Sequence, residues 1–188
     1  MKGYDAIVRW SLLAGLCSLM PLPFLDAWLE RRCRAHLYAG LARAHGVTFP
    51  TVQSDALLAA PDGWMPGCVA GLAYVVVKKI FRTVFFFLTF IDVAHGAAVT
   101  ALRGVLVEAA FAHGRLPGDA EHVRDAMGEV LLAETRHPLF RLVRGFPRSG
   151  LAELGPTGLA GTVVAWLLAV EGAATARDVF LARLEARS

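Results

Sequence analysis

The stretch "KKIFRTVFFFLTFIDVAHGAAVTALRG", residues 78–104, decides the fold prediction for this chain. It lies in a segment from Gly67 to about Ala112 that contains no proline, and nothing in the chain alternates between apolar and polar residues for long enough to predict a strand. The segment therefore predicts one long helix or two nearly collinear helices, with Gly96 and Gly104 as the weakest points.

Leucine, alanine and tryptophan recur at helical spacing through the rest of the chain, so we predict an all-α protein. A length of 188 residues is sufficient for one hydrophobic core that folds alone. We expect a single domain, residues 1–188, built as a compact bundle of about six to seven helices with one long central helix, partly membrane-associated.

The first two helices are separated by a proline-rich segment. The first is predicted over about Gly3–Met20, and it stops there because Pro21 and Pro23 hold the chain extended. Asp26 then begins a second helix, for which Gly46 is a plausible C-terminal stop. We interpret Pro21, Pro23 and Asp26 as a structural turn that fixes how the two helices pack.

The remaining helices are predicted from their start signals. Residues 46–66 indicate a loop that holds one short turn capped by Ser54. Asp119 caps a further helix, whose apolar face consists of Val123, Met127, Val130 and Leu131. The last helix is predicted to begin at Pro156 or Thr157 and to run to the charged tail.

Ionisable side chains interrupt the long apolar segment, where burial would be costly. On a continuous helix, Asp92, Thr100 and Arg103 fall within about 40° of Lys78 and form one narrow polar stripe, and His95 follows Asp92 by three residues. We expect this stripe to face water or a wet seam between helices, that is, a gap between packed helices that holds water. A buried contact of Asp92 and His95 with another helix, or a site where they supply two metal ligands, remains an alternative.

The composition raises the question of a membrane. Hydrophobic residues make up 56% of the chain without counting glycine, against about 45–50% with glycine in ordinary soluble domains. The longest uncharged runs, Trp10–Leu25, Gly63–Val77 and Leu154–Val170, each fall just short of the roughly 18–20 residues that span a bilayer. Half-inserted hairpins or interfacial helices are therefore at least as consistent with the sequence as full spans.

A cluster of basic and aromatic residues precedes the polar stripe. Cations beside aromatic rings suit a membrane interface, where the charged heads reach the phosphates and the rings lie deeper, although a plain core helix gives the same pattern. We interpret the cluster as a membrane-interface segment made of Lys78, Lys79, Arg82, Phe85, Phe86 and Phe87.

Sequence motifs exclude several common activities. The chain contains no phosphate-binding loop, no H-E-x-x-H, no G-x-S-x-G and no C-x-x-C pair. Its formal charge is only +3, and the arginines alternate with acids, which argues against nucleic acid as a partner. Cys17, Cys33 and Cys68 are widely spaced and are expected to be reduced thiols on the cytosolic side of a membrane. We predict no cofactor and no metal.

Residues 13–47, "LAGLCSLMPLPFLDAWLERRCRAHLYAGLARAHGV", resemble the opening of a bacterial helical domain of unknown function, found alone or attached to small GTPases. The matching residues are Pro21, Pro23, Asp26, His45 and Gly46, and "RLVRGFPRSG" with Pro147 and Gly150 is similar to a later part of that domain. The resemblance covers about a third of the chain. It implies a membrane-associated helical module, and a GTPase partner would have to act in trans.

Three functions are compatible with these features. The first is a non-enzymatic, membrane-associated helical module that acts through lipid or protein partners, at the cytoplasmic face of the inner membrane or, alternatively, in the cytoplasm. The second is a small helical enzyme or metal-binding protein centred on Asp92 and His95. The third is a soluble helical protein that binds an apolar ligand. The sequence favours the first, hence a protein that is not an enzyme, and leaves the oligomeric state open.

Overall fold

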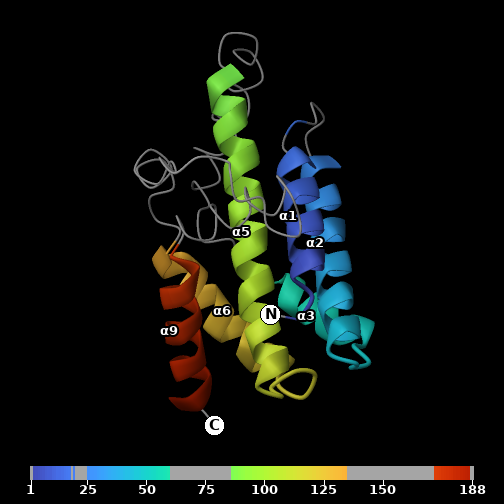
Figure 1. Cartoon of the computed structure of the whole chain (residues 1–188), viewed down its shortest axis with the longest axis vertical. Coiled ribbons are helices and arrows are strands. Elements are labelled where there is room, and N and C mark those ends of the chain that lie inside the picture. Colours follow the sequence, from blue (N-terminus) through green and yellow to red (C-terminus); the bar gives the residue numbers. More distant parts are fainter. Residues whose placement is uncertain (1, 18, 20–24, 60–85, 135–171, 187–188) are drawn as a thin grey trace, which may run out of the picture.

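Six α-helices and the turns that flank them make up the described part of the protein (Figure 1). This computed structural model describes residues 2–17, 19, 25–59, 86–134 and 172–186, with the backbone alone at 26, 86–92, 133 and 134. The helices are α1 (Tyr4–Cys17), α2 (Leu25–Ala44), α3 (Thr51–Leu58), α5 (Phe86–Ala112), α6 (Ala120–Glu134) and α9 (Ala173–Ala186). No strand occurs within these ranges, so the predicted all-α helical bundle is confirmed.

The long helix α5 lies at the centre of the bundle. Figure 1 shows α1 and α2 on one side of it and α6 and α9 on the other, while α3 packs against both α2 and α6. Every residue of α5 from Ala97 to Phe111 is buried, so this part of the helix has no side that faces water. The predicted long central helix is confirmed over Phe86–Ala112, and it continues through both Gly96 and Gly104.

Burial explains why this helix is so apolar. Within the described ranges, Val93–Ala112 is the one stretch long and apolar enough to cross a membrane, with a mean hydropathy of 1.2. Of this stretch, however, 83% is buried among the other helices. The apolar surface of α5 is therefore already covered by protein, as in the core helix of a bundle.

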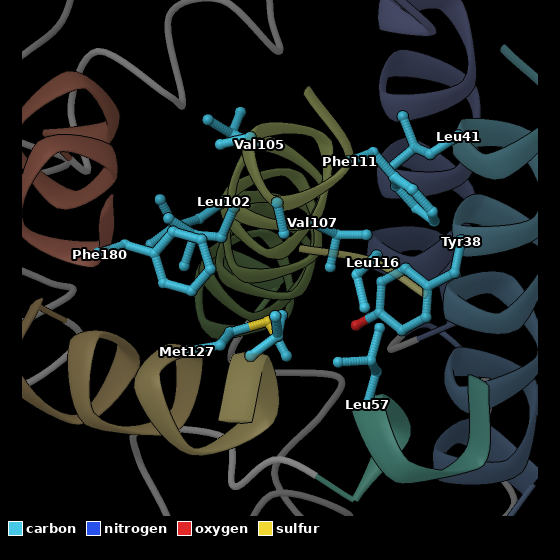
Figure 2. Close-up of a cluster of buried hydrophobic side chains, with 14 of the residues drawn as sticks. Tyr38, Leu41, Leu57, Leu102, Val105, Val107, Phe111, Leu116, Met127 and Phe180 are labelled. Atoms are coloured by element: carbon cyan, nitrogen blue, oxygen red, sulfur yellow. The ribbon is translucent and has the colours of Figure 1, made fainter. Parts of the chain in front are cut away.

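The core around α5 is assembled from all the neighbouring helices (Figure 2). Phe180 of α9 packs beside Leu102, and Met127 of α6 lies beneath them in this view. On the other side, Tyr38 of α2 and Leu57 of α3 close the core, and both are fully buried. Each large side chain buried in this way stabilises the fold by about 1.5–3 kcal/mol relative to exposure.

Glycines allow α1 to approach α5 closely. A Cβ atom at Gly15 would lie 2.5 Å from the backbone oxygen of Val93 and 2.9 Å from the Cβ of Ala97. A Cβ atom at Gly104 of α5 would lie 3.0 Å from the Cγ1 of Ile7. Gly104 is therefore a packing position, and close contact with α1 offsets its low helix propensity.

The predicted glycine stop of α2 is confirmed. Gly46 adopts a φ of +68° and donates its N–H to the carbonyl of Arg43 at 3.1 Å, while Val47 donates to the carbonyl of Ala42 at 2.9 Å. This pair of bonds satisfies the last carbonyls of the helix and is the Schellman arrangement. Gly114, with a φ of +67°, ends α5 by the same pair of bonds.

Two predictions about the loops have different outcomes. The cap assigned to Ser54 is wrong, because Ser54 lies inside α3 and the N-cap residue is Pro50, which has no side-chain cap bond. Pro50 is extended, with φ −62° and ψ 149°, so the helix begins directly after it. The turn at Pro21 and Pro23 lies outside the described residues, and Asp26 belongs to the first turn of α2.

We expect Gly15→Ala to lower the free energy of unfolding by about 1–3 kcal/mol, because the added methyl group would collide with the backbone of α5. Gly118→Ala is the matched control, since a Cβ there meets nothing within 4 Å and the expected change is under about 0.5 kcal/mol. Urea unfolding of both variants measures the difference. Equal stability of the two variants would contradict the close α1–α5 contact.

Tyr38→Phe is expected to leave stability unchanged or to raise it by up to about 1 kcal/mol. Tyr38 is fully buried, and its hydroxyl, which faces Leu57 and Leu116 in Figure 2, makes no hydrogen bond to any part of the chain that the structure describes. Thermal and urea unfolding test this, with Tyr38→Ala as a control that should cost about 3–5 kcal/mol. A loss of more than about 1 kcal/mol in Tyr38→Phe would show that the hydroxyl stabilises the fold.

Candidate functional site

The outer face of α1 changes from charged to apolar along the helix. Asp5 and Arg9 are exposed in its first half, and Leu13 and Leu16 take the corresponding exposed positions in its second half. Leu13 is 41% exposed, Leu16 49%, and Leu19, just beyond the helix, 39%. Solvent-facing leucines in succession are unusual on a helix whose other face already packs into a core.

The beginning of α2 extends this apolar surface. Trp28 is 53% exposed, and the guanidinium carbon of Arg32 lies 5.3 Å from the centroid of its ring, within the range of a cation–π contact. The end of α1 and the beginning of α2 lie at the same end of the molecule (Figure 1), so these side chains lie toward one end of the α1–α2 hairpin. We call the four residues Leu13, Leu16, Leu19 and Trp28 the apolar tip.

Helix α5 begins at the same end of the molecule as the apolar tip (Figure 1). Its first seven residues, 86–92, have the sequence FFLTFID, and their backbone is helical. Phe86 and Phe87 of the predicted membrane-interface segment belong to these turns, whereas Lys78, Lys79, Arg82 and Phe85 lie outside the described residues. The interface prediction for this segment stays a prediction.

The polar stripe of α5 does not face water where the structure describes it. Thr100 and Arg103 are both fully buried, so the expectation that the stripe faces bulk water is wrong at these positions, while a wet seam between helices stays a prediction. The physical reason is that α1 and α2 cover one side of α5 while α6 and α9 cover the other. His95 is half-buried, and Asp92 is described by its backbone alone.

The structure brings no ligand set together around His95. Within the described ranges, no three His, Cys, Asp or Glu side chains lie where they could share a metal ion. A metal site in a helical bundle usually draws its ligands from several helices. The hypothesis of an enzyme or metal site at Asp92 and His95 gains no support from this part of the chain and stays untested at Asp92.

Sequence reasoning missed a polar cluster far from the apolar tip. Glu108 of α5 is 7% exposed, and its Oε1 accepts a hydrogen bond from the backbone N–H of Lys2 at 3.2 Å. His45 at the end of α2 places its Nε2 3.7 Å from the same oxygen, and its ring stacks on Phe111. The cluster therefore connects the N-terminal residues, α2 and α5, which indicates a structural role.

A groove of about 560 Å³ lies between α3 and the beginning of α6. Its walls include Gln53 from α3 and the acidic residues Asp119, Glu121 and Asp125. An apolar ligand requires a largely apolar cavity with few polar groups. This groove does not meet that requirement.

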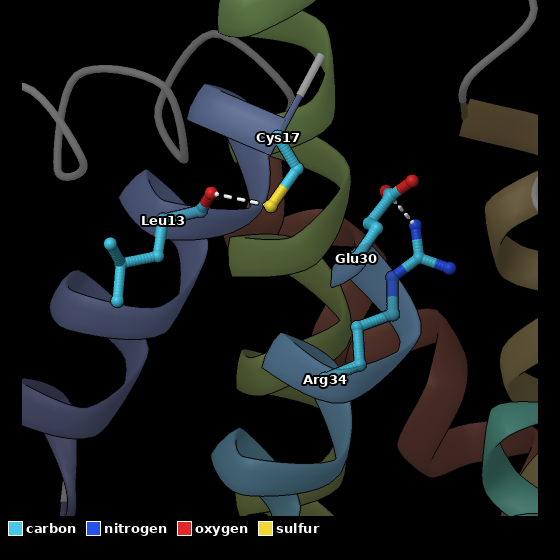
Figure 3. Close-up of polar contacts among 4 residues, drawn as sticks. All are labelled: Leu13, Cys17, Glu30 and Arg34. Atoms are coloured by element: carbon cyan, nitrogen blue, oxygen red, sulfur yellow. Dashed lines mark hydrogen bonds and ion pairs between the residues drawn. The ribbon is translucent and has the colours of Figure 1, made fainter. Parts of the chain in front are cut away.

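Two cysteines lie near the apolar tip, Cys17 in the last turn of α1 and Cys33 in α2. The Cys17 thiol donates to the carbonyl oxygen of Leu13 at 3.1 Å (Figure 3). The Cys33 side chain is buried. Burial, then the neighbouring Cys17, raises the pKa of Cys33 to about 11.

Glu30 and Arg34, one turn apart on α2, form an ion pair near Cys33 (Figure 3). The Arg34 side chain is only 8% exposed. The pair thus lies at the edge of the core next to Cys33, where a charged hydrogen bond is stronger than on an open surface.

Comparison of the chain with protein-family models, with curated proteins and with solved structures gives no match.

We expect Cys33 to react with iodoacetamide at pH 8 at least about 100-fold more slowly than an ordinary cysteine, because only the thiolate reacts and a pKa near 11 leaves very little of it. The difference should disappear in urea, where Cys33 regains an ordinary pKa. Mass spectrometry of timed samples from the folded and the urea-unfolded protein measures the rate at Cys33. Equal rates in the two states would contradict the burial of Cys33.

Proposed function

We propose that this protein is a non-enzymatic helical module that attaches to a membrane surface through the apolar tip of its α1–α2 hairpin. The apolar tip is the observation that carries this proposal. Four large apolar side chains, each 39–53% exposed, stand at one end of a bundle whose described core packs around α5. Exposed apolar residues that gather in one place mark a surface for lipid or a partner.

The charges near the apolar tip favour an anionic lipid surface as the occupant. Arg9 precedes Leu13 by one turn of α1, and Arg32 and Arg31, which pairs with Asp55, follow Trp28 by one turn of α2. All three arginines are exposed. Exposed apolar side chains with cations one helical turn away are consistent with the division of a bilayer into hydrocarbon and phosphate.

This mode of attachment is consistent with the burial of α5. A helix already enclosed by protein does not need lipid around it, so the bundle would lie on the membrane and insert only its tip. The corresponding location is the cytoplasmic face of the inner membrane. The resemblance to a helical domain attached to small GTPases adds a GTPase acting in trans as a proposed protein partner.

The proposal predicts that the purified protein binds vesicles containing anionic phospholipid. We expect the double substitution Leu16→Ser and Trp28→Ala to lower the partition coefficient at least about tenfold, since each side chain loses part of the about 1.5–3 kcal/mol that burial provides. Vesicle flotation at several salt concentrations measures this. Persistence of binding at high salt would indicate inserted side chains, and complete release would indicate attachment by the arginines alone.

The matched control replaces exposed apolar residues elsewhere on the bundle. Leu132 of α6 is 43% exposed and Val179 of α9 40%, so Leu132→Ser with Val179→Ser removes two exposed apolar side chains away from the apolar tip. This control should bind vesicles like the parent protein. The proposal fails if the parent does not float, or if both double variants lose binding equally. A dimer that only the tip substitution dissociates would instead assign the tip to a second copy of the chain.

A further inference from the structure

We propose that Arg32, held against the ring of Trp28, binds the phosphate group of an anionic phospholipid and is the side chain that recognises the lipid headgroup. The inference rests on the proposed membrane attachment and deepens it, because it assigns the headgroup contact to one residue. Trp28 belongs to the apolar tip, and Arg32 lies one turn further along α2.

The contact between the two side chains fixes the arginine without occupying its hydrogen-bond donors. The guanidinium carbon of Arg32 lies 5.3 Å from the centroid of the Trp28 ring, and both side chains are exposed. The ring face attracts the cation and restricts a side chain that would otherwise be flexible. Because the indole has no conventional acceptor, the N–H groups of Arg32 remain available to a ligand.

Arg32 differs in this respect from most other arginines in the described part of the chain. Arg31 pairs with Asp55 at 3.6 Å, and Arg34 pairs with Glu30. Four more arginines have carboxylate partners: Arg115, Arg124, Arg177 and Arg183 pair with Asp119, Asp125, Asp178 and Glu129. Among the described residues, Arg32 contacts an aromatic ring and makes no ion pair, so its charge is open to an anion from outside the chain.

The position of Arg32 matches the depth of lipid phosphates. Trp28 is 53% exposed at the same end of the molecule as Leu16, so insertion of the apolar tip carries the indole into the membrane first. Arg32 follows by one helical turn, about 5.4 Å along the axis. The headgroup layer on each side of a bilayer is about 5–7 Å thick. With the indole at the edge of the hydrocarbon, the guanidinium therefore lies among the phosphates.

Phosphate suits a stacked guanidinium better than it suits a free cation. A phospholipid phosphate has two unesterified oxygens that share the negative charge, and a guanidinium donates two parallel N–H bonds to such a pair. A lysine ammonium carries the same charge but offers neither the planar fork nor the same contact with an indole. Replacement of Arg32 by lysine thus removes the geometry and keeps the charge.

The test measures flotation of the full chain with phosphatidylcholine vesicles that contain phosphatidylglycerol, over a series of salt concentrations. We expect Arg32→Lys to lower the partition coefficient about fivefold, because the bidentate contact is lost. The dependence on salt should stay the same, since the formal charge is unchanged. Arg9→Lys is the matched control, because Arg9 is exposed and has no ring contact or ion pair with a described residue, and it should change binding less than about twofold.

A second variant tests whether Trp28 and Arg32 act as one unit. Trp28→Leu keeps an apolar side chain for insertion but removes the ring that holds the arginine. Combined with Arg32→Lys, it should bind no more than about twofold more weakly than Trp28→Leu alone, because residues that act together give non-additive losses. Urea unfolding of each variant checks that the bundle is intact.

Each outcome decides between the two proposals. If the parent protein floats and Arg32→Lys binds no more weakly than Arg9→Lys, the phosphate contact is overturned while the membrane attachment stands. Losses that simply add in the double variant overturn the role of Trp28 in holding the arginine. If the parent does not float, both proposals fail. Potassium phosphate that releases the protein more strongly than potassium chloride at equal ionic strength would overturn the lipid as the occupant and assign the contact to free phosphate.

Discussion

The burial of α5 on every side is the constraint on which the rest of this structure depends. A helix without a water-facing side must be covered from at least two directions, and the chain meets this need with α1 and α2 on one side and α6 and α9 on the other. The covering helices must also pack closely against α5, since a gap the size of a methyl group would remove van der Waals contacts. Gly15 and Gly104 satisfy that condition where α1 meets α5.

The same constraint explains why polar residues on α5 are buried. Once both sides of the helix are covered, a polar side chain must be buried wherever it occurs along the enclosed length. Arg103 and Thr100 are buried for this reason, and Glu108 is buried beside the backbone of Lys2 and the ring of His45. Buried polar groups of this kind restrict which neighbours a helix accepts, because each one must meet suitable partners.

The α1–α2 hairpin combines core packing with exposed apolar side chains at the same end. Ala14 and Gly15 of α1 pack into the core, whereas Leu13 and Leu16 of the same turns are exposed. Because the buried and exposed side chains lie on different faces of one helix, the attachment proposed above would leave the contacts with α5 in place.

The sequence by itself determined the all-α class, the long central helix and the glycine that ends α2. It also determined the apolar face of α6, whose predicted residues Val123, Met127, Val130 and Leu131 are all buried. These features follow from backbone chemistry and side-chain periodicity within a few residues, which any stretch of chain carries in itself. Only the tertiary structure decided that Arg103 is buried, and that Leu16 and Trp28 stay exposed. Exposure and contact depend on which distant helices cover a given face, and no local pattern contains that information.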